Sequence, residues 1–262
     1  MGQVMDNLKL MKNVRDLESP QTLLELIAGM EQHMALYQSG IQEIRTKLEI
    51  LQRDAHFGEG HNPIDSIKSR IKSPMSIIEK MYRKGFPISL DSMRANLNDV
   101  AGIRVICPFI EDIYTVAQML TRQDDLVVIK EKDYIKNPKP NGYRSYHLVL
   151  QVPVFLSDRK EMVRVEVQLR TIAMDFWASL EHQIHYKTSC EVPDSVVDEL
   201  KQCADIIAQT DERMQQLSKQ IRCFNAQPTS EGGEEAQEHP LGSLISASVV
   251  GMAGGMAGSH ND

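Results

Sequence analysis

Cysteine is scarce in this sequence and is never arranged as a metal site or a disulfide framework would need. The 262 residues include four cysteines, and none of them forms a C-x-x-C pair. No apolar run approaches about 18 residues, so we expect no membrane span. Residues 1–16 mix Lys with Asp and contain no apolar signal-peptide core. These absences argue against a zinc ribbon, a disulfide-rich secreted protein and a membrane protein, and we expect reduced thiols and a cytoplasmic location.

The sequence also has no large excess of either charge sign. It carries 29 Lys and Arg against 36 Asp and Glu, a net charge of −7. Two short segments are nonetheless basic: residues 68–84 hold six cations and one carboxylate, and residues 130–144 hold five cations and two carboxylates. Two basic islands on an acidic protein fit a small polyanion held in a cleft. A nucleic-acid track would make a whole face basic, so we expect no stable nucleic-acid partner.

The hydrophobic pattern divides the chain into five parts. We expect an N-terminal extension at 1–20, a helical segment at 21–61, a main domain at 62–190, a helix at 191–224 and a disordered tail at 225–262, which lacks Lys and Arg. Apolar residues at helical spacing predict one long helix from about 22 to 53, where Ser39-Gly40 permits a slight break. The later helix has 4-3 apolar spacing from Val196 to Ile221, which fits either packing on its own domain or a contact between subunits.

The main domain alternates predicted strands and helices. Asn62-Pro63 and Ser73-Pro74 each resemble an N-cap followed by proline, so we predict a short helix at the first and a helix to about residue 84 at the second. Two more helices are predicted at 111–122 and 171–187. Strands are predicted at 69–72, 101–107, 126–132, 145–152 and 162–170. The sequence therefore predicts an α/β (α+β) fold with a five-stranded mixed β-sheet flanked by helices, and long helices at either end.

The first group of chemically informative residues is Arg70, Lys72, Ser76 and Lys80. Arg70 and Lys72 share a face of the predicted strand, and Ser76 and Lys80 share a face of the following helix. Free backbone N–H groups at the start of that helix add to the positive field. These residues suit a polyphosphate, although a solvated basic helix face fits them as well.

The second group is Asp99 and Arg104. Asp99 lies just before a buried-type strand, where a carboxylate is a candidate Mg²⁺ ligand. Arg104 lies within that strand and needs a partner or a planar surface to stack on. The simpler alternative is an Asp cap paired with the arginine.

The third group is the turn Lys-Pro-Asn-Gly-Tyr-Arg-Ser-Tyr-His at residues 139–147, with Lys132 shortly before it. Proline and glycine shape the turn. Its Tyr143 is able to stack on a base, a contact worth about 1–3 kcal/mol. Lys139 and His147 add polar groups, and the alternative is a basic turn with packed tyrosines.

The fourth group lies in Val-Glu-Val-Gln-Leu-Arg at residues 165–170. The period of 2 in a strand puts Glu166, Gln168 and Arg170 on one face. Glu166 could ligate a metal or accept a proton from a hydroxyl. The alternative is a salt bridge to Arg164 or Arg170. No G-x-x-x-x-G-K-[ST] loop is present, so a nucleotide site must be of another kind.

Taken in order, these four segments resemble the synthetase domain of the RelA/SpoT family, most closely its stand-alone small alarmone synthetases. The resemblance covers about residues 40–222, and the segments 133–147 and 165–177 are its most specific parts. It implies a nucleotidyltransferase-like synthetase domain that is Mg²⁺-dependent. It further implies that the β,γ-pyrophosphoryl group of ATP moves to the 3′-hydroxyl of GDP or GTP, which releases AMP and makes the alarmones ppGpp and pppGpp of the stringent response.

The resemblance also implies roles for individual residues. The ATP-binding set is Arg70, Lys72, Ser76, Lys80 and Arg104, with the two arginines on either side of adenine. The acceptor-binding set is Lys132, Lys139, Tyr143, His147 and Gln168, with Tyr143 stacked on guanine. The catalytic and metal-binding pair is Asp99 and Glu166.

The same resemblance leaves other readings open. The chain has no His-Asp dipeptide of the kind found in the alarmone-degrading domain of longer relatives, so we expect synthesis without hydrolysis. Some relatives place pyrophosphate on the 3′ end of tRNA or on adenine nucleotides, and the net negative charge argues against tRNA. An idle nucleotide sensor is disfavoured by the presence of both Asp99 and Glu166. By analogy we expect a homo-oligomer, a tetramer.

Overall fold

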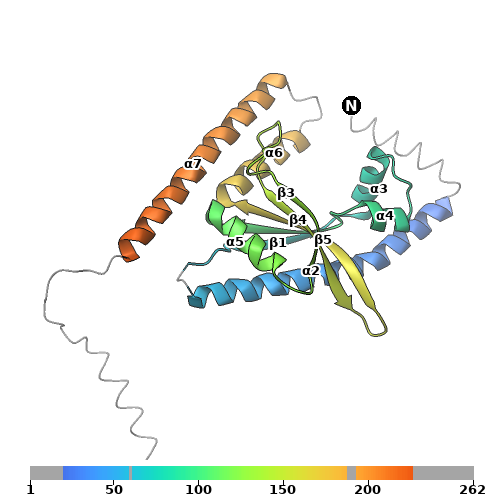
Figure 1. Cartoon of the computed structure of the whole chain (residues 1–262). Coiled ribbons are helices and arrows are strands. Elements are labelled where there is room, and N and C mark those ends of the chain that lie inside the picture. Colours follow the sequence, from blue (N-terminus) through green and yellow to red (C-terminus); the bar gives the residue numbers. More distant parts are fainter. Residues whose placement is uncertain (1–19, 59–60, 188–192, 227–262) are drawn as a thin grey trace, which may run out of the picture. The chain divides into compact units, whose positions relative to one another are not determined.

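The computed structural model of the chain describes residues 20–58, 61–187 and 193–226, so the expected N-terminal extension and almost all of the expected tail lie outside it. The chain divides into two units, Met1–Gln220 and Ile221–Asp262, and every element below lies in the first except the last residues of the final helix. The helices are α2 (Pro20–Gly58), α3 (Pro74–Arg83), α4 (Leu90–Asn96), α5 (Ile110–Thr121), α6 (Ile172–Lys187) and α7 (Asp194–Ala226). The strands are β1 (Ser66–Ile71), β2 (Ala101–Cys107), β3 (Val127–Asp133), β4 (Tyr146–Phe155) and β5 (Lys160–Thr171), as Figure 1 shows.

The five strands form one mixed sheet in the order β1-β2-β5-β4-β3. Only the β2–β5 pair is parallel, and the other three pairs are antiparallel. The predicted fold class, an α+β fold with a mixed five-stranded sheet, is therefore confirmed. The central strand β5 comes late in the chain but pairs with the early strand β2, so the sheet brings residues near position 100 beside residues near position 166.

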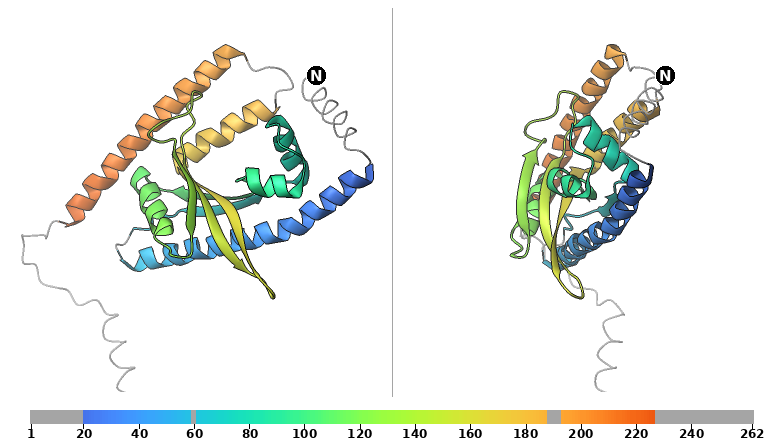
Figure 2. Two further views of the ribbon diagram at one scale, coloured as in Figure 1. Left: turned by 45° about the vertical axis from the view of Figure 1, so that its right-hand side comes forward. Right: turned by 90° about the vertical axis from the view of Figure 1, so that its right-hand side faces the viewer.

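The hydrophobic core lies between one face of this sheet and the helices that cover it. Alternate residues of β5, from Val163 to Leu169, are buried in the core, as the period of 2 requires. Helix α2 contacts β1, β2, β4 and β5, and its apolar stripe, including Ile41, Ile44 and Leu48, is buried. Figure 2 shows α2 running along one side of the sheet. The other face of β5 is left for polar side chains.

The permitted break in α2 does not occur. The helix continues through Gly40, which is buried against β5. A Cβ at this position would lie 2.7 Å from Cγ1 of Val163. The glycine therefore allows α2 to pack closely on the sheet, and it does not bend the helix.

One other local prediction is wrong, and one helix was not predicted. The segment after Asn62-Pro63 is not helical, because the Asn62 side chain accepts a hydrogen bond from the N–H of Ile64 at 3.0 Å and forms a turn, after which β1 begins at Ser66. Helix α4 was not predicted, although Ser89 caps it through the N–H of Ser92 at 3.1 Å. No helix in the described ranges is long and apolar enough to cross a membrane.

Candidate functional site

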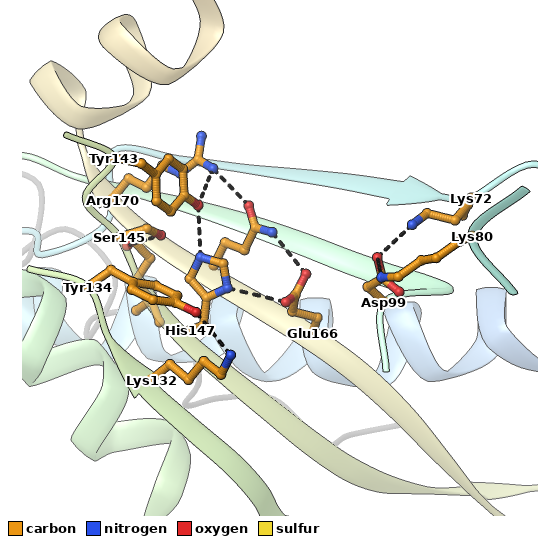
Figure 3. Close-up of polar contacts among 12 residues, drawn as sticks. Lys72, Lys80, Asp99, Lys132, Tyr134, Tyr143, Ser145, His147, Glu166 and Arg170 are labelled. Atoms are coloured by element: carbon orange, nitrogen blue, oxygen red, sulfur yellow. Dashed lines mark hydrogen bonds and ion pairs between the residues drawn. The ribbon is translucent and has the colours of Figure 1, made fainter. Parts of the chain in front are cut away.

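The polar face of β5 carries a ring of hydrogen bonds centred on Glu166. Pairing of β4 with β5 sets His147 opposite Gln168, so the histidine lies within reach of the carboxylate. Nδ1 of His147 lies 3.2 Å from Oε1 of Glu166, and Nε2 of Gln168 donates to Oε2 at 2.9 Å. Figure 3 shows His147 and Glu166 with the dashed line between them. Glu166 is thus held by an imidazole and an amide, and not by Arg164 or Arg170.

Arg170 and Tyr143 close the ring. Nη2 of Arg170 donates to Oε1 of Gln168 at 3.0 Å and to the hydroxyl of Tyr143 at 2.7 Å. That hydroxyl lies 2.8 Å from Nε2 of His147. Because the ionised Glu166 only accepts, Nδ1–H of His147 donates to it, and in the neutral tautomer Nε2 then accepts the hydroxyl proton of Tyr143. Each of the five side chains bonds to two others of the ring, which fixes the orientation of the carboxylate.

Glu166 remains ionised despite its partial burial. Burial raises the pKa of Glu166, and the nearby Asp99 carboxylate acts in the same direction, but His147 and Gln168 outweigh both and hold the pKa below its usual value. The side chain is therefore a negative charge at neutral pH.

Asp99, just before β2, is the second carboxylate of the site. Its Oδ2 lies 2.6 Å from Nζ of Lys72 and 2.6 Å from Nζ of Lys80. Burial raises the pKa of Asp99, and the hydrogen bonds and charges of the two lysines overcome this effect, so the pKa is lowered. Its other oxygen, Oδ1, is buried and has no hydrogen-bond partner in the described part of the chain. Asp99 thus keeps one oxygen available for a further cation.

The simpler sequence interpretation paired Arg104 with Asp99, but the structure pairs it with Asp175. Nη1 of Arg104 and Nη1 of Arg170 both lie 3.1 Å from Oδ1 of Asp175, in the first turn of α6. Nζ of Lys68 lies 3.8 Å from Oδ2 of the same carboxylate. Burial lowers the pKa of Arg104 and the charge of Arg170 adds to this, while Asp175 partly offsets them. Asp175 was not predicted from the sequence, where its only signal is an acidic residue in the first turn of the helix that follows the strand of Arg170.

Two clefts meet at the carboxylates. The first has a volume of about 260 Å³ and is lined by Lys68, Ser69, Arg70, Lys72, Asp99, Gly102, Ile103, Arg104, Glu166 and Gln168. The second has a volume of about 530 Å³ and is lined by Lys80, Lys84, Phe86, Asn96, Leu97, Asn98, Asp99, Lys130, Lys132, Tyr134, Lys139, His147, Val149 and Glu166. Asp99 and Glu166 are the two residues common to both linings. We call these the first and the second cleft.

The clefts separate most of the predicted donor and acceptor residues. Arg70, Lys72 and Arg104 line the first cleft, and Lys132, Lys139 and His147 line the second. Lys80 lines the second cleft while contacting Asp99, and Gln168 lines the first although it was assigned to the acceptor.

Two predicted residues line neither cleft. The hydroxyl of Ser76 accepts a hydrogen bond from Ser73 at 2.9 Å, at the start of α3. Tyr143 packs against a small apolar cluster that includes Trp177, and Nζ of Lys139 lies 4.5 Å from the centroid of its ring. Tyr134, which the sequence analysis did not assign, lines the second cleft, and its hydroxyl accepts from Nζ of Lys132 at 3.0 Å.

Helix α7 holds the turn that carries Tyr143. Nη2 of Arg144 lies 3.0 Å from Oδ1 of Asp205, and Gly142, with φ of 87°, lies so close to α7 that a Cβ would be 2.6 Å from Cβ of Ala204. Indole Nε1 of Trp177 in α6 donates to the carbonyl of Leu200 at 2.9 Å. The turn, α6 and α7 therefore form one packed unit.

The apolar seam predicted for α7 is displaced from the stripe that is buried. Ala204, Asp211 and Gln215 are buried, and two seam residues, Leu200 and Ile207, pack beside them. The seam residues Cys203, Thr210, Met214 and Leu217 are exposed. Packing on the domain therefore accounts for one stripe of α7. The exposed stripe beside it leaves a contact between subunits as a prediction.

Residues 69–191 match the family model described as a region found in RelA / SpoT proteins. GTP pyrophosphokinase YwaC of Bacillus subtilis (strain 168) is 44% identical over 209 residues, which are 80% of this chain and 98% of that protein. The crystal structure of small alarmone synthetase 2 from Bacillus subtilis is similar, with 45% identity, a TM-score of 0.67, and coverage of 73% of this chain and 98% of that one. Small alarmone synthetase 1 from the same organism, bound to its product pppGpp, has 34% identity, a TM-score of 0.69, and coverage of 74% and 98%.

Proposed function

The chain belongs to the RelA/SpoT family, and we propose that it synthesises ppGpp and pppGpp by moving the β,γ-pyrophosphoryl group of ATP to the 3′-hydroxyl of GDP or GTP. Curated relatives that this chain covers by 90% or more are GTP pyrophosphokinases, and a structural relative is bound to pppGpp. The observation that carries the proposal is the pair of cation-lined clefts that share Asp99 and Glu166. Such an arrangement suits two nucleotides whose reacting groups meet between the carboxylates.

We assign ATP to the first cleft. The guanidinium of Arg104 is held by Asp175, which leaves its plane available for stacking on adenine, with Arg70 as the proposed partner on the other side. Lys72, on Asp99, and Lys80 would contact the phosphates of ATP. Transfer of a phosphoryl-type group depends mainly on such positioning and on positive charge around the moving group.

Glu166 is proposed to act on the acceptor hydroxyl. The 3′-oxygen attacks the β-phosphorus, the bond from that phosphorus to the oxygen of AMP breaks, and the hydroxyl proton passes to Glu166. The ring through His147, Tyr143, Arg170 and Gln168 keeps the carboxylate ionised and aimed for this role. General-base assistance of this kind is typically worth about 10²–10⁴-fold in rate.

The donor groups fit Mg²⁺. Among the described residues no group of three or more His, Cys, Asp or Glu side chains is suited to a metal, but Mg²⁺ is usually held by one or two carboxylates together with substrate phosphates. Oδ1 of Asp99 is buried without a partner, and Glu166 lines the same two clefts. Asp99, with or without Glu166, would hold the ion, which when bound would neutralise phosphate charge.

The acceptor is assigned to the second cleft. Five of its side chains are lysines, enough to surround a di- or triphosphate: Lys80, Lys84, Lys130, Lys132 and Lys139. We propose guanine stacking on Tyr143, which requires Lys139 to move from its place near the ring. Tyr134 is the competing platform because it already lines the cleft.

We also propose a homo-oligomer, with a tetramer as the form expected by analogy, in the cytoplasm. An apolar groove of about 540 Å³ lies between α6 and α7 and includes Phe109, Ile172, Phe176, Ile207 and Met214. Ile172, Phe176 and Met214 are each more than half exposed, and contiguous apolar surface of this kind is typical of interfaces. Light scattering that finds a monomer at micromolar concentration would exclude the assembly.

One assay tests the activity. The protein is incubated with γ-labelled ATP, Mg²⁺ and GDP, GTP, an adenine nucleotide or tRNA, and nucleotides are separated by chromatography. Label on GDP or GTP with one AMP released per transfer supports the proposal. Label only on tRNA or an adenine nucleotide would assign a different acceptor. If no label is transferred, the remaining hypothesis is a nucleotide sensor without catalytic activity. Recovery of added ppGpp unchanged would support the proposed lack of alarmone hydrolysis.

A further inference from the structure

A third cavity lies away from the two clefts, among α2, α4 and the β4–β5 pair. Its volume is about 180 Å³, and it is lined by His33, Leu36, Tyr37, Arg94, Gln151, Met162, Val163 and Arg164. It shares no lining residue with either cleft. Pockets for drug-sized ligands usually have about 300–1,000 Å³, so this cavity suits a group the size of phosphate and not a whole nucleotide.

Arg164 brings an uncompensated charge to this cavity. Its Nη1 donates to the carbonyls of Ala95 at 2.8 Å and Arg94 at 3.3 Å, and to Oδ1 of Asn98 at 3.3 Å. All three acceptors are neutral oxygens, and Arg164 has no carboxylate partner among the described residues. Its Nε and Nη2 take no part in these bonds, so they remain able to donate.

Arg94 and Tyr37 supply further donors. Arg94 uses Nη2 for a contact of 3.2 Å with Glu161, a residue outside the cavity lining, and its Nε and Nη1 take no part in that contact. The side chain of Tyr37 is 7% exposed. Burial raises the pKa of Tyr37, while the charges of Arg94 and Arg164 act to lower it, as expected of two guanidinium groups near the phenol. No carboxylate lines the cavity.

From this geometry we propose that the cavity of Tyr37, Arg94 and Arg164 binds a phosphate-sized oxyanion, either free phosphate or the phosphate group of a small monoester. Two guanidinium groups and a phenol would donate charge-assisted hydrogen bonds to its oxygens. Arg164 lies two residues before Glu166 on β5 and bonds to Asn98, the residue before Asp99, so the bound anion would contact a side chain linked to both segments that carry the proposed catalytic carboxylates.

Phosphorus NMR of inorganic phosphate, titrated with the full chain in the absence of nucleotide, tests this proposal. Saturable line broadening is expected in the wild type. Arg94→Gln should weaken the affinity about tenfold or more, since it removes a charged donor, and Tyr37→Phe about threefold to tenfold. Arg159→Gln is the matched control, because Arg159 also contacts Glu161 but does not line the cavity. It should leave the affinity unchanged.

A Lys139→Gln variant separates this cavity from the second cleft. If the broadening is absent in the wild type, is equal in Arg94→Gln and Arg159→Gln, or disappears in Lys139→Gln alone, the cavity is not the site and the proposal fails. Arg94 is partly exposed, so its variant remains informative if circular dichroism shows that Tyr37→Phe does not fold. A parallel titration with AMP assigns the source: broadening that depends on Arg94 indicates a phosphate monoester, and its absence indicates free phosphate.

Discussion

The two clefts hold their cations in different ways. In the first cleft Lys72 is bound to Asp99, and Lys68 and Arg104 to Asp175. In the second, Lys80 is bound to Asp99, but Lys132 and Lys139 contact tyrosine rings or hydroxyls, and neither has a carboxylate partner among the described residues. One cleft is therefore pre-organised by ion pairs before a ligand arrives, while the other presents unneutralised positive charge. The first should favour geometric fit, and the second should favour attraction of phosphate.

The largest effect should come from the residues that belong to both clefts. Glu166→Gln should lower kcat by about 10²–10⁴-fold, because it keeps the size of the side chain but removes the charge that is proposed to accept the proton. Asp99→Asn should behave similarly, and added Mg²⁺ should restore little. The kcat of each variant is measured from steady-state rates, and thermal unfolding checks that the variant is folded. Glu161→Gln, on the same strand but in neither cleft lining, is the control; wild-type turnover in Glu166→Gln would make that carboxylate structural.

A crossed pair of variants should separate donor from acceptor. Arg104→Lys keeps the charge but loses the planar group and the fork to Asp175, so the KM for ATP should rise about tenfold or more while that for the guanine nucleotide changes little. Lys132→Met should do the reverse, since it removes a cation of the second cleft. The KM values for both substrates, measured in both variants, show which cleft binds the donor and which binds the acceptor. If each variant changes the KM of the other substrate, the assignment of the clefts is reversed.

The base platform should be identified by two tyrosine variants. Tyr143→Ala should raise the KM for the guanine nucleotide about fivefold to a hundredfold, which corresponds to about 1–3 kcal/mol of stacking, and should affect ATP less. Tyr134→Ala is compared under the same conditions. A larger rise in Tyr134→Ala would move the guanine to the tyrosine that already lines the second cleft.

Salt should sharpen the contrast between paired and unpaired cations. Raising KCl from about 0.05 to 0.3 M should increase the KM for the guanine nucleotide several-fold more than that for ATP, because exposed unpaired charges are screened more strongly than close ion pairs. The two KM values are measured at constant free Mg²⁺. An equal rise in both would remove the proposed electrostatic difference.

A further expected effect concerns stability and not turnover. The folded-state pKa of Asp99 lies below its unfolded value, so its stabilising contribution is complete above the unfolded pKa of about 3.9 and is lost as pH falls through the folded pKa. Asp99→Asn should therefore lower the free energy of unfolding by about 1–3 kcal/mol at pH 7, because Lys72 and Lys80 lose a charged partner. Urea unfolding at pH 7 and below pH 4 should show this difference narrowing, and a constant difference would contradict the assignment.

Local periodicity predicted much of this molecule, because it depends only on neighbours in sequence. The alternation at residues 165–170 placed Glu166, Gln168 and Arg170 on one face, and they are linked there by hydrogen bonds. The mixed sheet followed from the number and kind of its elements. Predictions that used a single local signal fared worse, as at Asn62-Pro63, where the side-chain hydrogen bond of a turn took the place of a helix cap.

Contacts between segments that are distant in the sequence could not be predicted from local periodicity. The role of Asp175 becomes visible only when β2 and β5 lie side by side and bring Arg104 and Arg170 to one carboxylate. The division into two clefts likewise depends on the strand order. The buried stripe of α7 includes Asp211 and Gln215, which apolar spacing would not select: Asp211 accepts a hydrogen bond from Thr171 at 2.6 Å, and Gln215 bonds to Glu111.

The close contact of Gly142 with Ala204 has a consequence for synthesis on the ribosome. The turn at Gly142 and Arg144 rests on a helix whose contacting residues follow Arg144 by about 60 positions. At a translation rate of about 5–20 residues per second, those residues are made roughly 3–12 s after the turn. A nascent chain that already contains Asp99, Glu166 and every lysine of the second cleft thus lacks the support for the turn that is proposed to bind guanine. Alarmone synthesis should therefore begin only after α7 has been translated. Truncated chains that are released before α7 is made should be inactive.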